Sequence, residues 1–321
     1  MTRTRADYAT LAPTEQTALY YAQRASPGGL LITEATHISP EATPVWTIYS
    51  AVREGGGHVP GIWTNIQTQG WREVVDAVHD QRALISCQLL HAGRVAQPGI
   101  GDHPIVRGTG AQLPSVSSSA TALCPGQEGG DYSWDQPAVE PRALETDEIA
   151  RVIDDYRRAA RNAVLAGFDF VEVHAAHGFP LSYLMLTEPR VGALSLAPEA
   201  DGSQTQPLRN ARFRKIYRGM LIGAGGFTPR TAEAAVADGI YDLVAFGRWF
   251  LANPDLPGRL LAGTPLNVYD RKTFYGAGAE GYTDYPNFSQ TGAGRSGKYP
   301  LIDQSQIGTS LKGARNKHAT R

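Results

Sequence analysis

Two histidines three residues apart, His174 and His177, lie at the end of a short apolar run, FDFVEVH, which His174 closes. Imidazole nitrogens can donate hydrogen bonds to a carbonyl oxygen or to the heteroatoms of a ring, and they also ligate zinc. The helical zinc motif places its histidines four residues apart with a glutamate after the first, and the spacing here differs. We therefore predict a pair of hydrogen-bond donors and no metal. The alternative is that one histidine only satisfies backbone groups at a strand end.

Polar side chains also end other strand-like runs. Gln88 and His91 lie in CQLLHAGR, and Arg248 lies in FGR. Glu188 and Arg190, in TEPRV, are further candidates. In a (β/α) barrel all strand carboxyl ends meet at one mouth, so such groups would face a common ligand.

Glycines follow two late strand-like runs. Gly225 and Gly226 lie in IGAGGF, just before the helical segment TPRTAEAA, and Gly247 precedes Arg248. Glycines let the backbone approach a phosphate, and main-chain N–H groups at helix starts favour the anion. We predict a phosphate site here. The alternative is that these glycines only form tight turns.

Apolar strand-like runs alternate with amphipathic helical runs, and this order is typical of a parallel sheet with crossover helices. The helix–strand connections AGFDFVEVH and DGIYDLVAFGR resemble each other, and such an internal repeat is expected of a (β/α) barrel. A doubly wound sheet gives the same local pattern. Strands are predicted over 29–36, 83–94, 168–174, 219–226 and 242–248, and helices over 71–81 and 145–166.

Composition limits the function classes. The net charge of −1 gives no overall field that would recruit nucleic acid or an anionic membrane. Two cysteines, Cys87 and Cys124, are too few for a disulfide scaffold or a cysteine-rich metal site. We see no signal peptide and no apolar run of about eighteen residues. We expect a cytoplasmic protein without membrane partners.

Two segments differ from this scheme. Residues 95–143 are rich in Gly, Pro and Ser, and we expect a long loop or lid. Residues 289–321 are polar, basic and glycine-rich, and we expect a disordered tail. A nucleic-acid role for this tail is a weak alternative, because aromatic residues are nearly absent from it.

Ordered blocks over most of residues 1–288 resemble the Old Yellow Enzyme family. They are MTRTRA, YYAQRASPGGLLITEAT, HVPGIW, CQLLHAGR, AARNAVLAGFDFVEVHAAHG, EPRV, AFGRWFLANPDLPGRL and YDRKTFYGAGAEGYTDYP. Within the family, the sequence resembles fungal members of secondary metabolism and plant oxophytodienoate reductases. The resemblance implies a (β/α)8 barrel over 1–288 that holds FMN, is reduced by NADPH and saturates the C=C bond of an enone or enal.

The resemblance also implies roles for individual residues. His174 and His177 would grip the carbonyl oxygen of the substrate. FMN would contact the remaining residues, with the ring beside Thr2, Ala35 and Gln88, the phosphate at Gly225, Gly226, Gly247 and Arg248, and the closing loop at Phe274 and Tyr275.

The chain departs from the family at the proton donor. Members usually have a tyrosine two residues beyond the second of the paired residues, where this chain has Phe179, which has no proton to give. In relatives that act on ergot-type aldehydes this change accompanies isomerisation, so a redox-neutral isomerase is an alternative function. Tyr183 is a nearby candidate for the missing donor.

The chain is also shorter than the family pattern. Only PLSYL joins HAAHGF to the EPRV strand, whereas a parallel crossover needs about a dozen residues. We infer that the fifth and first strand units are missing, and that VWTIYSAVREGGG (45–57) is an insertion. A truncated or mis-spliced gene model is our preferred explanation, and a degenerate, non-catalytic relative is the alternative.

Overall fold

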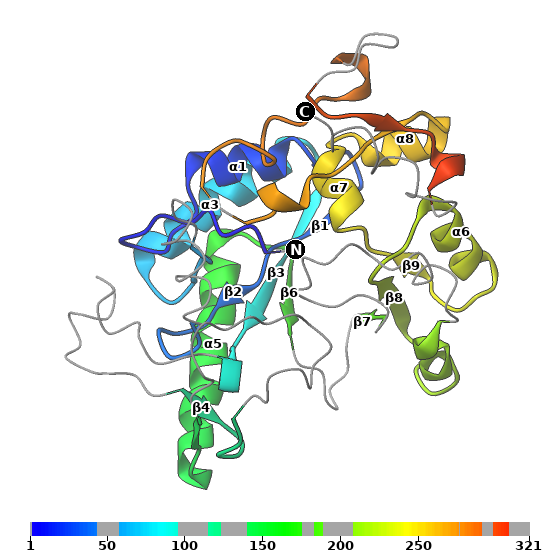
Figure 1. The fold of residues 1–321 in the computed structure, drawn as a ribbon. Helices are drawn as coiled ribbons and strands as arrows, with labels where there is room; N and C mark the ends of the chain where they lie inside the picture. The colour runs from blue at the N-terminus through cyan, green and yellow to red at the C-terminus, as the bar shows by residue number, and fades with distance from the viewer. Residues whose placement is uncertain are drawn as a thin grey trace, which may run out of the picture. The chain divides into compact units, whose positions relative to one another are not determined.

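The computed structural model describes residues 2–43, 58–95, 115–122, 140–174, 183–188, 208–275, 277–290 and 298–307. They belong to two compact units, which are described separately (Figure 1). The first unit comprises Met1–Glu128, Ser133–Ala176 and Asp270–Asp284. The second comprises Gly129–Tyr132, His177–Tyr269 and Tyr285–Arg321.

A parallel sheet organises the first unit. Its strands are β1 (Leu30–Ile32), β2 (Thr36–His37), β3 (Leu84–Leu90) and β6 (Phe170–Val173). On β3, Ser86 pairs with residues of both β1 and β6, and Leu89 pairs with residues of both β2 and β6. A strand has only two edges, so β3 lies in the middle, with β1 and β2 along one edge and β6 along the other.

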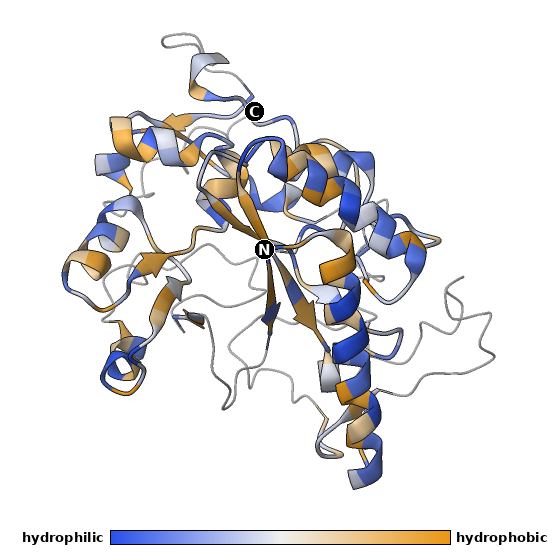
Figure 2. Ribbon diagram, turned by 180° about the vertical axis from the view of Figure 1, so that it is seen from behind, coloured by the Kyte–Doolittle hydropathy of each residue, from blue (hydrophilic) through white to orange (hydrophobic). Residues whose placement is uncertain are grey.

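Three helices accompany this sheet: α1 (Glu15–Ala22), α3 (Asn65–His79) and α5 (Ile149–Ala166). The Thr64 hydroxyl accepts a hydrogen bond from the Gln67 N–H and thereby caps α3. Gly167 ends α5 in the left-handed conformation, with φ of 97°. α3 and α5 pack against each other and against β3. Hydrophilic and hydrophobic residues alternate along α5, as an amphipathic helix requires (Figure 2).

The core of the first unit uses one face of β3. Ile85, Cys87 and Leu89 alternate along the strand and are almost completely buried. Trp71 of α3 is also fully buried, and its indole N–H donates to the Gly61 carbonyl at 3.1 Å. Cys87 is therefore a small apolar core residue, and burial raises the pKa of its thiol to about 12. The other face of β3 carries Leu84, Ser86, Gln88 and Leu90.

The second unit contains a smaller parallel sheet. Its strands are β7 (Tyr183–Thr187), β8 (Met220–Ala224) and β9 (Leu243–Val244), and its helices are α6 (Pro229–Ala237), α7 (Arg248–Ala252) and α8 (Leu256–Ala262). Leu221 of β8 packs with Phe227 and Tyr241 in a buried cluster that includes two alanines of α6. This packing fixes the β8–α6 joint, where the predicted phosphate glycines lie.

Several short elements complete the two units. The strands are β4 (Val116–Ser117), β5 (Arg142–Ala143), β10 (Leu266–Asn267) and β11 (Leu301–Ile302). The 3-10 turns are η1 (Gly93–Val95), η3 (Thr146–Glu148), η4 (Arg209–Lys215), η5 (Arg271–Thr273), η6 (Phe288–Gln290) and η7 (Gln304–Gln306).

The structure differs from the sequence prediction in two segments. Residues 298–307 lie in the predicted disordered tail 289–321, yet Leu301 and Ile302 pair antiparallel with β10, and Ile307 packs in an apolar cluster. The predicted loop 95–143 contributes β4 and β5, which pair in parallel. A few apolar residues in a polar segment are enough to add such short strands, and composition alone does not reveal them. The proposed insertion 45–57 lies outside the described residues.

The parallel pairing expected of a (β/α) barrel is present in both units, and each predicted strand run contains a strand. The described strands form separate sheets and not one closed ring. Among the described helices, none has both the length and the apolar character needed to cross a bilayer.

Candidate active site

Gln88 lies on β3 in the first unit, on the face opposite Cys87 and Leu89. Its backbone N–H donates to the Thr33 hydroxyl at 2.9 Å, and its side-chain Nε2 donates to Glu172 Oε1 at 2.5 Å. Gln88 on β3 and Glu172 on β6 are register partners, so their side chains leave the same face of the sheet. The sequence predicted Gln88 as a site residue but did not identify Glu172.

His174 follows β6 directly. Its backbone N–H donates to the Leu89 carbonyl at 2.9 Å, and its residue is exposed. Because side chains alternate along a strand, His174 continues the face that carries Glu172. His177 and Phe179 lie outside the described residues. Tyr183, the alternative proton donor, begins β7 and is half-buried.

The buried carboxylate of Glu34 links the segments that carry Thr2 and Ala35 in the first unit. Glu34, the neighbour of Ala35, accepts hydrogen bonds at Oε2 from the backbone N–H groups of Arg3 at 2.9 Å and Thr4 at 3.1 Å. Thr4 has φ of 57°, a left-handed conformation that a non-glycine residue adopts only when its surroundings hold it. Burial raises the pKa of Glu34, and the two N–H donors oppose this shift. Glu34 therefore holds the segment that carries Thr2.

The loop with Phe274 and Tyr275 is held by buried guanidinium groups. Arg3 donates to the Gly281 carbonyl at 2.7 Å, and Arg5 donates to the Phe274 carbonyl at 3.3 Å. Burial and then the neighbouring Arg3 lower the pKa of Arg5 to about 10. Phe274 is almost completely buried, and burial raises the pKa of Tyr275. The structure therefore places Thr2, Ala35, Phe274 and Tyr275 on segments tied together by Glu34 and by the arginines.

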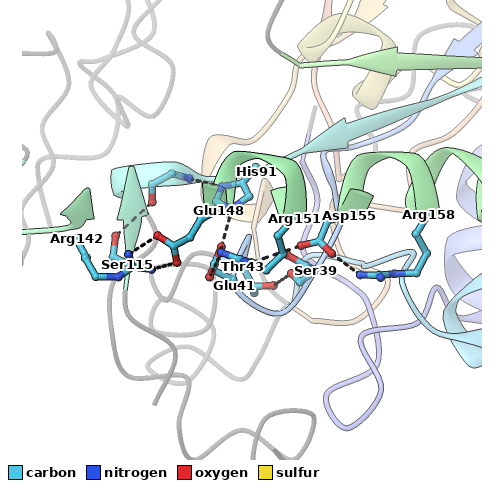
Figure 3. Close-up of polar contacts among 11 residues, drawn as sticks. Ser39, Glu41, Thr43, His91, Ser115, Arg142, Glu148, Arg151, Asp155 and Arg158 are labelled. Carbon is cyan, nitrogen blue, oxygen red and sulfur yellow. Dashed lines mark hydrogen bonds and ion pairs between the residues drawn. The ribbon is translucent and has the colours of Figure 1, made fainter. Parts of the chain in front are cut away.

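His91, another sequence candidate, belongs to a structural network (Figure 3). Its Nδ1 accepts from the Gly93 N–H at 3.0 Å, so its Nε2 carries the proton and faces Glu41 Oε1 at 3.5 Å. Arg151 of α5 donates to both Glu41 oxygens at 3.1 Å. Burial alone would raise the pKa of Glu41, but hydrogen bonds from His91 and Arg151 bring it below its usual value. This network ties the segments after β2 and β3 to α5.

The second unit places Gly225 and Gly226 at the turn from β8 into α6. Their φ angles are 92° and 67°, which glycine adopts without strain. A Cβ built on Gly225 would lie 2.9 Å from the Glu188 carbonyl oxygen, so no side chain fits there. Thr228 caps α6 by accepting from the Thr231 N–H. A glycine turn ahead of a capped helix is a setting in which main-chain N–H groups bind phosphate.

Gly247 and Arg248 also lie in the second unit, at the start of α7. The Arg248 guanidinium lies 5.5 Å from the centroid of the Tyr269 ring. Glu188, a sequence candidate, is instead buried and structural, because its Oε1 accepts from the Tyr241 hydroxyl at 2.5 Å. Arg190 lies outside the described residues.

The first unit contains Thr2, Gln88 and the loop with Phe274 and Tyr275, and the second contains the glycine turn and Arg248. No cluster of three metal-ligating side chains occurs among the residues described.

We expect Gly225→Ala to weaken FMN binding by at least tenfold, or about 1.4 kcal/mol. The alanine Cβ would meet backbone atoms of Glu188, and these cannot move as a flexible side chain would. Gly239→Ala is the matched control, because Gly239 has φ of 66° but no heavy atom within 4 Å of the added Cβ. Titration of each apoprotein with FMN, followed by flavin fluorescence, gives the two affinities. Equal affinities for both variants would contradict a phosphate site at Gly225.

Comparison with known proteins adds independent information. The model of a family described as "NADH:flavin oxidoreductase / NADH oxidase family" matches residues 1–189. Putative 12-oxophytodienoate reductase 4 of Oryza sativa subsp. japonica is 36% identical over 350 residues, covering 85% of this chain and 84% of the rice protein. The morphinone reductase structure has a TM-score of 0.69 at 31% identity, covering 92% of this chain and 93% of its own.

A second morphinone reductase structure, in complex with tetrahydroNAD, has a TM-score of 0.68 at 32% identity, covering 92% and 93% of the two chains. Sequence family, relatives and solved structures thus agree on a flavin oxidoreductase. This chain belongs to the NADH:flavin oxidoreductase / NADH oxidase family, that of the Old Yellow Enzymes, and is a flavin-dependent oxidoreductase whose cofactor is FMN.

Proposed function

We propose that the protein reduces the C=C bond of an α,β-unsaturated ketone or aldehyde, with NADPH as the reductant of its FMN. The main support is the similarity to oxophytodienoate reductases along 85% of the chain. The tetrahydroNAD complex of morphinone reductase supports the nicotinamide, and the choice of NADPH rests on the sequence resemblance.

The proposed roles follow from the chemistry of the side chains. When bound, FMN supplies the hydride. The imidazole N–H groups of His174 and His177 would stabilise negative charge that develops on the carbonyl oxygen of the substrate. Gln88 would orient the flavin ring, and the glycine turn at Gly225 would bind its phosphate. Phe274 would exclude water from the ring.

A spectrophotometric assay tests this proposal. The purified protein should show the flavin absorption bands, NADPH should bleach them, and an enone such as cyclohexenone should restore them. A simple unconjugated alkene should not restore them, since it has no carbonyl to polarise. Bleaching that no enone or enal reverses would contradict the proposed reaction.

A redox-neutral isomerase is the second candidate, and Phe179 is the residue that favours it. Phenylalanine cannot donate the proton that completes net reduction, so a reduced intermediate would persist long enough to rotate and be reoxidised.

We expect Phe179→Tyr to increase NADPH consumption relative to isomerised product by tenfold or more, since general acid catalysis contributes about 10²–10⁴-fold. Phe179→Leu is the control, because it changes the side chain without adding a proton donor. Product ratios from a conjugated enal, measured by chromatography beside NADPH loss, give the comparison. An unchanged ratio in the tyrosine variant would exclude Phe179 as the determinant.

We also propose that the protein acts in fungal secondary metabolism, in the cytoplasm.

We propose further that the chain lacks strand units of the complete family fold. The alignment to the rice relative is 350 residues long, more than the 321 residues of this chain, so the relative has segments without a counterpart here. Sequencing the transcript around the codons of Phe179 and Ser182 would show whether an exon is absent.

A further inference from the structure

We propose that Glu172 is a positioning residue for FMN, which acts by fixing the side-chain amide of Gln88. The proposal rests on the proposed contact between Gln88 and the flavin ring. It assigns a role to a carboxylate that neither the histidine pair nor the phosphate site uses.

The geometry gives Gln88 a single amide orientation. A carboxylate oxygen can only accept a hydrogen bond, whereas the two ends of an amide differ, one donating and one accepting. Glu172 Oε1 lies 2.5 Å from Gln88 Nε2, so the donating end of the amide must face β6. The Gln88 carbonyl oxygen and the second N–H then remain as a donor–acceptor pair on the same face of the sheet.

The backbone makes this contact precise. Gln88 and Glu172 are register partners in the β3–β6 ladder, and the Gln88 N–H is also bound to the Thr33 hydroxyl of the segment after β1. Both side chains therefore start from strands whose positions are fixed by the sheet, and the pair occupies the face opposite the buried Cys87 and Leu89. Groups on rigid strands hold a ligand more precisely than groups on loops.

A flavin ring can use such an amide. Its pyrimidine edge alternates a ring N–H donor with carbonyl acceptors, and a fixed amide matches this pattern with one donor and one acceptor. An amide free to turn over would present the wrong end for part of the time. With Gln88 in contact with the ring, a negative charge on its partner Glu172 would disfavour the reduced, anionic form of FMN.

The test compares FMN affinity, visible spectrum and midpoint potential in five proteins: the unsubstituted chain, Glu172→Gln, Glu172→Asp, Gln88→Leu and the double variant Glu172→Gln/Gln88→Leu. Glu172→Gln keeps an acceptor but loses the charge and the fixed orientation. We expect affinity to fall roughly three- to tenfold, consistent with loss of about one hydrogen bond. We also expect a shift of the midpoint potential to more positive values. Glu172→Asp should restore the potential in part.

The double variant separates positioning from a general structural effect. If Glu172 acts through Gln88, then Glu172→Gln should cause little further loss of affinity once Gln88 is leucine. Additive losses, or unchanged affinity and potential in Glu172→Gln, would overturn the inference, and circular dichroism checks that each variant is folded. Failure of the unsubstituted protein to bind FMN would overturn the proposed function as well. A normal spectrum in Gln88→Leu would overturn the inference and the Gln88 contact while leaving the reductase proposal intact.

Discussion

Glu34→Leu is expected to abolish FMN retention and to lower the free energy of unfolding by about 2–6 kcal/mol. Leucine leaves the backbone N–H groups of Arg3 and Thr4 buried without their acceptor, and each such group costs about 1–3 kcal/mol. Arg3 and Thr4 follow directly on Thr2. Loss of the anchor would therefore release the residue proposed to contact the reactive edge of the flavin.

Glu34→Gln is the control for this prediction. Its amide oxygen can still accept from both N–H groups, so the loss of unfolding free energy should be about half of that in Glu34→Leu, and FMN should bind weakly. Urea unfolding followed by tryptophan fluorescence gives the stabilities, and gel filtration with flavin detection gives retention. If the leucine and glutamine variants both behave like the unsubstituted protein, Glu34 does not hold the segment.

Acidification should destabilise the first unit through His37. This side chain is fully buried, and among the described residues neither ring nitrogen has a hydrogen-bond partner. Burial and then the nearby His91 lower the pKa of His37 from 6.5 to about 3. The folded state therefore keeps His37 neutral, while the unfolded chain takes up a proton below about pH 6.5.

The direction of this pH dependence follows from the linkage between proton uptake and unfolding. Stability is fully present above pH 6.5 and falls by about 1.4 kcal/mol per pH unit as the pH decreases toward 3, up to about 4–5 kcal/mol. His37→Leu should remove this dependence of the unfolding free energy on pH, because leucine cannot take up a proton. It should remain folded at pH 7, since the backbone bonds of residue 37 to Pro60 and Ile62 do not involve the side chain. Urea midpoints at pH 7 and pH 5 measure the effect, and equal pH dependence in both proteins would contradict it.

The sequence predicted the parts of the fold that depend on local patterns. Short apolar runs identified β3 and β6, and the helix predicted over 145–166 ends at Gly167, as α5 does. The glycines in IGAGGF indicated a phosphate site or a tight turn, and Gly225 and Gly226 form a turn there with positive φ angles. These features need only neighbouring residues, so they are visible in the chain itself.

The sequence could not reveal features that depend on distant partners. Glu34 is one carboxylate among many until the backbone of Arg3 lies against it, and Glu172 acquires its partner only through the β3–β6 register. His91 and Glu188 had the residue types of a site but are structural, because Glu41 and Tyr241 pair with them. A correct prediction of the β3–β6 register would have identified Gln88 and Glu172 as partners.

Titration of the purified chain with FMN tests the central claim most directly. The account predicts that the protein retains FMN through gel filtration, with quenched flavin fluorescence and about one flavin per chain. A folded protein that passes through the same column colourless, even after incubation with excess FMN, would contradict it.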